Sequence, residues 1–170
     1  DSGVVVSESL RVGGDRMNES IARHIKRKRR LVIGLPTAED LKISIGTVDR
    51  KAPQTDVVVR GRDVATGLPN STIVSSVDIQ EAIEPHMTSI LEGIKNILEK
   101  TPPELVSAIA DHGIILTGGG ALVDGVDRTI TRSIGVAAYV VESPQYAVIR
   151  GTARALDEMS SLRDTLEELQ

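Results

Sequence analysis

The sequence of 170 residues has no cysteine, no tryptophan and no phenylalanine, and its only aromatic residues are Tyr139 and Tyr146. Without cysteine the chain forms neither disulfides nor a thiolate zinc cluster. The scarcity of aromatic side chains means that the core must be aliphatic and that few rings are available to stack on single-stranded nucleic acid. The formal net charge of −4 also argues against a general nucleic-acid binder, so we expect no nucleic-acid partner.

Several other patterns are absent. The sequence has no apolar run of about 18 residues and no secretory signal pattern, so we expect no membrane-spanning segment. It has no initiator methionine and opens in an apolar stretch, Val4–Val6, which predicts a strand and suggests a piece of a longer protein. No catalytic motif is present. His24, His86 and His112 each lack a second ligand at metal spacing, which predicts surface or capping roles and no metal site.

The most informative feature is an apolar run, Ile114–Thr117, that leads directly into Gly118, Gly119 and Gly120. This order predicts a buried strand, a turn of bare backbone and then a helix. Glycines allow a phosphate to approach closely, and a helix start offers N–H groups. The stretch departs from the dinucleotide fingerprint because Val123 replaces its third glycine. A phosphate site and a turn without ligand are equally compatible with this stretch alone.

Two helices are predicted in the first part of the chain. Asp15 or Asn18 is expected to cap the first, which ends in the basic run Lys26–Arg30, predicted to be a solvated helix end. Thr37–Asp40 resembles a capping box that opens the second helix. On that helix Glu39 and Lys42 share one face, where they could pair with each other or present an acceptor and a donor to one ligand.

The pattern changes between Gly46 and Ser76, where short apolar runs alternate with turn residues and predict an inserted antiparallel unit. Asp78 is then expected to cap the longest helix, which either begins after Glu84 or kinks at Pro85. Thr101 is expected to cap the next helix.

Three separated stretches, taken together, resemble MreB, the bacterial actin homologue: Leu10–Asp15, Pro36–Gly46 and Leu116–Leu122. Their order and spacing match the second half of that family. The resemblance implies an α/β fold, a lobe of the actin/DnaK-type ATPases (ribonuclease H-like) with an inserted small α+β subdomain. Residues 1–34 and 77–170, with a C-terminal helix, would form subdomain IIA, and residues 35–76 subdomain IIB.

The resemblance also implies half of a cleft that binds ATP with Mg²⁺. The glycines would line the phosphate and adenosine side, and Glu39 and Lys42 would reach the ribose and adenine. The family's second phosphate loop, expected just before this chain, is not found ahead of Gly3, so the chain alone is predicted to bind nucleotide weakly and not to be an ATPase. The predicted nucleotide-binding residues are Gly14, Glu39, Asp40, Leu41, Lys42, Gly118, Gly119, Gly120 and Ala121.

By the same resemblance, the parent protein would form head-to-tail filaments at the inner, cytoplasmic face of the cell membrane. It would dock a RodZ-type membrane adaptor, contact the membrane through its other lobe and organise the cell-wall elongation machinery to set rod shape. Two alternatives stay open on the sequence. One is a lobe of another ATPase of this fold, a DnaK-type chaperone or a sugar or acetate kinase. The other is a scaffold module that uses no nucleotide.

Overall fold

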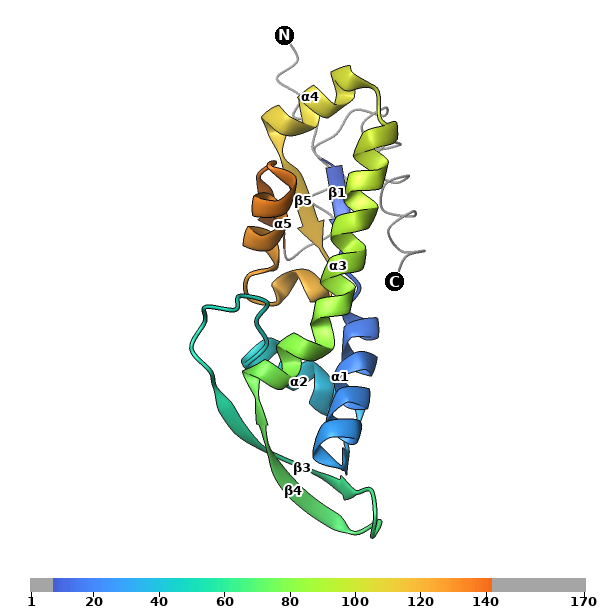
Figure 1. Cartoon of the computed structure of the whole chain (residues 1–170), viewed down its shortest axis with the longest axis vertical. Coiled ribbons are helices and arrows are strands. Elements are labelled where there is room, and N and C mark those ends of the chain that lie inside the picture. The colour runs from blue at the N-terminus through green and yellow to red at the C-terminus, as the bar shows by residue number, and fades with distance from the viewer. Residues whose placement is uncertain (1–7, 142–170) are drawn as a thin grey trace.

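The computed structural model describes residues 8–141, with side chains from residue 12 onward. The predicted strand at Val4–Val6 and the predicted C-terminal helix lie outside these residues. In the described part, helix α3 (Ser76–Lys100) runs along the long axis of an elongated body, with a β-hairpin at one end and helix α4 (Pro103–His112) at the other (Figure 1). None of the helices described is both long and apolar enough to cross a membrane.

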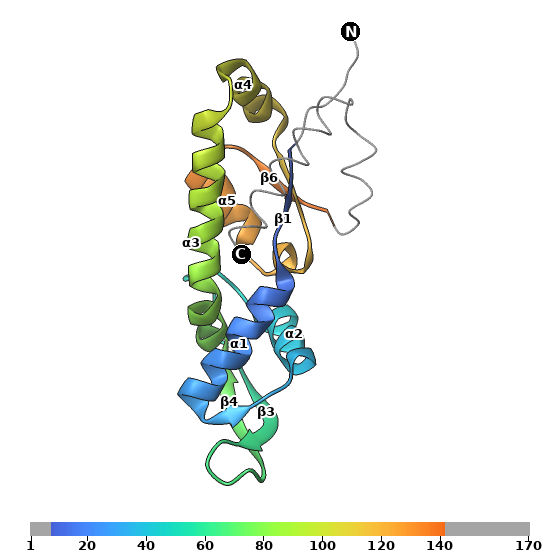
Figure 2. The ribbon, with the colours of Figure 1, turned by 90° about the vertical axis from the view of Figure 1, so that its right-hand side faces the viewer.

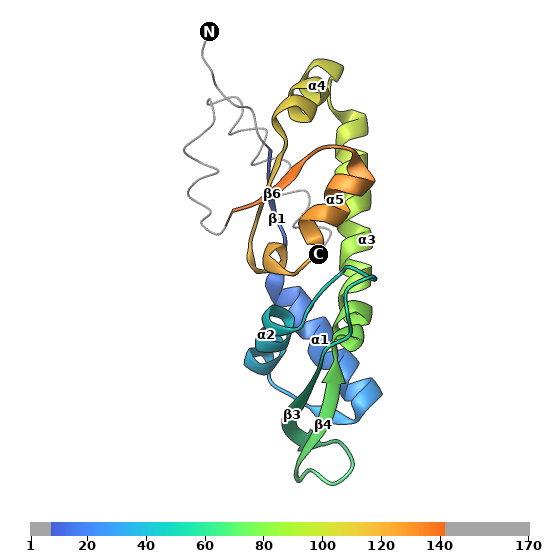
Figure 3. The same ribbon diagram turned by 90° about the vertical axis from the view of Figure 1, so that its left-hand side faces the viewer.

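A parallel sheet with strand order β1-β5-β6 forms one half of the body. Strand β5 is central and all four of its residues are buried, as its apolar run predicts. Figures 2 and 3 show α3 and α5 on the same face of this sheet. The elements are β1 (Glu8–Arg11), β5 (Ile114–Thr117), β6 (Ala138–Val140) and α5 (Val126–Ile134).

The inserted antiparallel unit predicted between Gly46 and Ser76 is confirmed. Strands β3 (Asp56–Asp63) and β4 (Pro69–Ser75) pair antiparallel, and β2 (Leu31–Val32) adds to the β3 edge. Strand β2 lies before residue 35, the predicted start of subdomain IIB, and that boundary stays a prediction.

Helix α1 (Gly14–Arg29) and helix α2 (Leu35–Ser44) both begin without a side-chain cap. The N-cap positions are Gly13 and Gly34, so the predicted caps by Asp15 or Asn18 and by Thr37–Asp40 are wrong. Those residues already lie inside the helices. Proline at the first turn of α2 replaces a cap because its missing N–H needs no partner.

The ends of α3 also differ from the prediction. Ser75 is the N-cap, and Asp78, three residues on, completes a capping box with it. The helix continues through Pro85 for 25 residues, so it does not begin after Glu84. The Thr101 hydroxyl donates to the Ile97 carbonyl at 2.6 Å and so closes α3 rather than capping α4.

Candidate functional site

The glycine turn follows β5 at the carboxyl edge of the parallel sheet, where α/β proteins commonly bind ligands. Gly118 has φ 91° and ψ 165°, a backbone conformation essentially reserved for glycine. The helix predicted directly after the turn is a short 3-10 helix, η1 (Gly119–Leu122), and α5 begins only at Val126. The Gly120 N–H donates to the Val12 carbonyl at 3.1 Å and is therefore not available to a phosphate.

Gly14, the first residue of α1, packs directly against this turn. A Cβ atom at Gly14 would lie 3.1 Å from Gly119 Cα, 3.2 Å from Gly120 N and 2.8 Å from Lys42 Nζ. Any larger residue would push the two segments apart. At Gly119 the situation is different, because the atom nearest to an added Cβ is Lys42 Nζ at 3.5 Å. The backbone at Gly119 therefore has room for a Cβ atom, which would make ordinary contacts with Lys42, Gly14 and Glu39.

Lys42 is completely buried, which is unusual for a lysine and requires partners. Its Nζ donates to Glu39 Oε2 at 2.9 Å and to the Gly14 carbonyl at 3.2 Å. Asn18 Nδ2 donates to the same oxygen of Glu39, while Asn18 Oδ1 is buried without a hydrogen-bond partner. Of the two possibilities open on the sequence for Glu39 and Lys42, the structure realises the mutual pair.

Glu39 remains an anion in this setting. Burial alone would raise the pKa of its carboxyl, but the hydrogen bonds from Asn18 and Lys42 and the charge of Lys42 outweigh burial and lower the pKa below its ordinary value. The second oxygen, Oε1, lies 3.9 Å from the position of a Cβ at Gly119. Because an ionised carboxylate only accepts hydrogen bonds, this oxygen suits a ligand hydroxyl or amino group.

The structure therefore brings together the glycines of the turn, Gly14, Glu39 and Lys42. Ala121 is buried in η1, directly after the turn. Leu41 belongs to the hydrophobic core and Asp40 is exposed, so their part in a ligand site stays a prediction. The sequence does not identify Asn18 as a site residue, because its residue type in the first turns of a helix predicts a cap.

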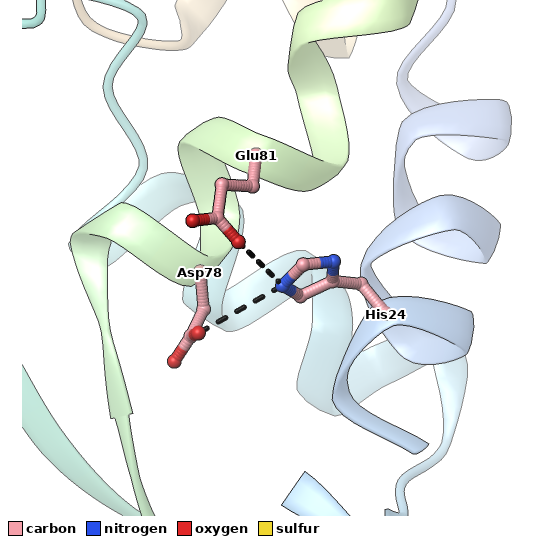
Figure 4. Close-up of side chains that lie close together, drawn as sticks. All are labelled: His24, Asp78 and Glu81. Carbon is pink, nitrogen blue, oxygen red and sulfur yellow. Dashed lines mark ion pairs between the residues drawn. The ribbon is translucent and has the colours of Figure 1, made fainter. Parts of the chain in front are cut away.

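A second polar cluster joins α1 to the start of α3 (Figure 4). His24 is only 7% exposed, so the predicted surface or capping role is wrong. Its Nε2 faces the carboxylates of Asp78 and Glu81. The basic run is not simply solvated either, since Lys28 Nζ lies 2.8 Å from Glu81 Oε2 and Arg29 Nη2 lies 2.9 Å from Asp78 Oδ2.

Burial acts on both titratable groups at the centre of this cluster. Burial lowers the pKa of His24, and the nearby charges of Glu81 and Asp78 only partly oppose it. Burial would raise the pKa of Asp78, but the Ser75 N–H and the Arg29 guanidinium outweigh it and lower that pKa. Near neutral pH the cluster therefore contains a neutral imidazole and an ionised, buried carboxylate.

The lowered pKa of His24 predicts an acid-sensitive stability. As the pH falls below the ordinary value of 6.5, the unfolded chain takes up a proton that folded His24 does not, so the free energy of unfolding decreases until the lower folded pKa is passed. Urea denaturation at pH values between about 7.5 and 5.5 measures this slope. His24→Gln should reduce this slope, leaving the part due to His86, whose pKa burial also lowers, whereas His112→Gln, at an exposed position, should not change it. An unchanged slope in His24→Gln would contradict the assignment.

The sequence of this chain is similar to those of known proteins. The family described as "MreB/Mbl protein" matches residues 1–164. The cell shape-determining protein Mbl of Bacillus cereus is 41% identical over 159 residues, which is 94% of this chain and 48% of Mbl. The cell shape-determining protein MreB of Escherichia coli K12 is 39% identical over 156 residues, 92% of this chain and 45% of MreB.

Among solved structures, MreB5 of Spiroplasma citri bound to ADP superimposes with a TM-score of 0.73 at 28% identity. The match covers 89% of this chain and 45% of MreB5. The chain thus spans about half the length of the curated relatives that it matches.

Proposed function

Since the chain belongs to the MreB/Mbl protein family, we propose that it forms one lobe of an actin-like protein that binds ATP and determines cell shape. The fold is that of the actin-like MreB and MamK proteins. The family match sets aside the chaperone and sugar-kinase alternatives. The lobe would contribute half of the nucleotide cleft, because the chain spans only 48% of the related Mbl.

One observation carries the nucleotide proposal: an atom added at Gly119 would meet no clash and would lie 3.5 Å from Lys42 Nζ and 3.9 Å from Glu39 Oε1. A phosphate could approach this bare backbone, and the ordered, ionised Glu39 could accept a hydrogen bond from a ribose hydroxyl or an adenine amino group. The relative MreB5 at 28% identity holds ADP, which supports a nucleotide as the ligand. Mg²⁺ would accompany the phosphates, and we assign it no ligand in this chain.

Hydrolysis requires charged and polar groups arranged on both sides of the phosphates. The described residues would supply one side, around Gly14 and the glycine turn. We therefore propose that the chain binds ATP–Mg²⁺ weakly alone, more tightly with the complementary lobe, and hydrolyses it only in the complete protein.

Self-association is the second part of the proposal. Val58 and Ile73 are cross-strand partners on β3 and β4, and they are 70% and 57% exposed, which is high for apolar side chains. Strands β3 and β4, which carry this pair, form the hairpin at one end of the body (Figure 1). A contact between that end and a different surface of the next copy would not close and would give a filament. A RodZ-type adaptor, the cell-wall elongation machinery and a cytoplasmic location at the membrane belong to the same proposal.

The test is isothermal titration of ATP–Mg²⁺ into this chain, alone and mixed with the part of Bacillus subtilis Mbl that this chain does not match. We expect binding to appear or to strengthen in the mixture. Gly119→Val should weaken it at least tenfold, about 1.4 kcal/mol, because its side chain fills the space beside Lys42 and Glu39.

Gly34→Val is the matched control. A Cβ at Gly34 also makes only an ordinary contact, 3.5 Å from Pro36 Cδ, and this residue has an unstrained φ of −82° at the exposed start of α2. Its binding should equal that of the unmodified chain. If folded proteins bind no nucleotide in any combination, the glycines are only a turn and the scaffold alternative holds.

A further inference from the structure

Two buried polar atoms in the cluster between α1 and α3 have no hydrogen-bond partner: His24 Nε2 and Asp78 Oδ1. The two side chains are only 8% and 1% exposed, and the two atoms face each other at 3.7 Å (Figure 4). Buried polar atoms are nearly always paired, because an unpaired one costs about 1–3 kcal/mol. The cluster is thus incomplete as a purely structural network.

The two oxygens of the Asp78 carboxylate have different surroundings. Oδ2 accepts the Ser75 N–H at 3.0 Å and two hydrogen bonds from Arg29, at 2.9 and 3.1 Å. These contacts fix the plane of the carboxylate and leave Oδ1 directed at His24. Metal ligands are held in this way, by hydrogen bonds that orient one donor atom toward the ion.

The donor atoms lie close enough together for small side-chain shifts to bring them around one divalent ion. His24 Nε2 lies 3.3 Å from Glu81 Oε2, and the donor atoms of His24, Asp78 and Glu81 all lie within 4.8 Å of one another. Nitrogen and oxygen ligands about 2.0–2.2 Å from tetrahedral zinc are about 3.3–3.6 Å apart. We propose that these three side chains bind Zn²⁺ or a similar divalent transition-metal ion, with water at the fourth position.

Two neighbouring cationic side chains must move before a metal ion can bind. Lys28 Nζ lies 2.8 Å from Glu81 Oε2 and 3.6 Å from Asp78 Oδ1, so it neutralises the same carboxylates. Arg27 Nη2 lies 3.3 Å from His24 Nδ1, which must carry the proton when Nε2 binds a metal. Both side chains can turn into solvent, because Lys28 is 43% exposed and Arg27 is exposed. Zn²⁺ therefore competes with Lys28 for the site.

The lowered pKa of His24 agrees with this role, since only the neutral imidazole ligates a metal. Glu81, with 43% of its side chain exposed, opens the site to solvent and gives an ion a path of entry. A bound ion would join the C-terminal half of α1 to the first turns of α3.

The experiment is isothermal titration of Zn²⁺ into the full chain near neutral pH, with cobalt absorption as a second readout of tetrahedral coordination. We expect one ion per chain. His24→Gln should weaken binding at least about tenfold and abolish the tetrahedral cobalt bands. Lys28→Met should tighten binding because it removes the competing charge, and Lys26→Met, an exposed lysine of the same run, should leave it unchanged.

Circular dichroism of each variant separates lost binding from lost folding. The proposal is overturned if folded Lys28→Met binds no zinc. It is equally overturned if His24→Gln retains the affinity and cobalt spectrum of the unmodified chain, since the ion would then sit on other residues.

Discussion

Replacing Asp78 with alanine is expected to lower the free energy of unfolding by about 3–4 kcal/mol. Asp78 is 1% exposed and accepts the Ser75 N–H that begins α3. Losing this half of the capping box costs about 1 kcal/mol, and losing the charged hydrogen bonds from Arg29 costs about 2–3 kcal/mol. Urea denaturation at neutral pH measures the difference.

Glu81→Ala is the matched control, because Glu81 belongs to the same helix and the same ion cluster. Its side chain is 43% exposed, and exposed ion pairs such as the one with Lys28 contribute only about 0–1 kcal/mol. We expect a loss in that range. Equal losses in the two variants would mean that general charge balance, and not the buried contacts of Asp78, stabilises this junction.

Lowering the pH should remove the stabilisation that the ionised Asp78 carboxylate gives to the unmodified protein. The pKa of Asp78 is lowered in the folded state because the hydrogen bond from the Ser75 N–H and the contact with Arg29 outweigh the opposing effect of burial. Its stabilisation is therefore complete above the ordinary value of 3.8 and is lost as the pH falls through the folded pKa. Asp78→Asn should show a smaller loss of stability over this acid range than the unmodified chain.

Much of the fold could be predicted from hydrophobic spacing, since the parallel strand β5, the helices and the inserted hairpin all follow from it. The helix caps could not be predicted in this way. Ser75 and Asp78 are both good capping types three residues apart, and only the extended backbone at Ser75 decides which of them is the N-cap. Thr101 had the sequence of a cap but its hydroxyl bonds backward to Ile97.

The candidate site, too, could be predicted from the sequence only in part. The glycines and the Glu39–Lys42 face could be found on sequence, the former by their pattern and the latter by helical spacing. The contact of Asn18 with Glu39 depends on how α1 packs against α2 and has no local signal. The burial of His24, in contrast, had a local signal in the sequence. His24 lies three residues after Ile21 and seven after Met17, on the buried stripe of α1.

The three glycines of the turn are required for different reasons, which the sequence pattern alone cannot distinguish. Gly118 is required by its positive φ, which other residues rarely adopt. Gly119 has room for a Cβ atom, so we propose that the binding of a ligand, and not packing, requires glycine there. Gly120 is required by packing, because a Cβ there would lie 2.6 Å from Val12 Cγ1 and 3.0 Å from Met17 Sδ.

Replacing Gly120 with valine is accordingly expected to destabilise the fold by about 3 kcal/mol or more, because overpacking a filled core typically costs about 1–3 kcal/mol and valine adds three carbons. Val12 and Met17 are 1% and 0% exposed and cannot move into solvent. Gly119→Val introduces the same side chain one residue earlier, where its Cβ meets no atom closer than 3.5 Å, and should unfold close to the unmodified chain. Urea denaturation of the pair separates the two roles: if both variants lose stability equally, Gly119 is also a packing residue and the room at its Cβ does not mark a ligand site.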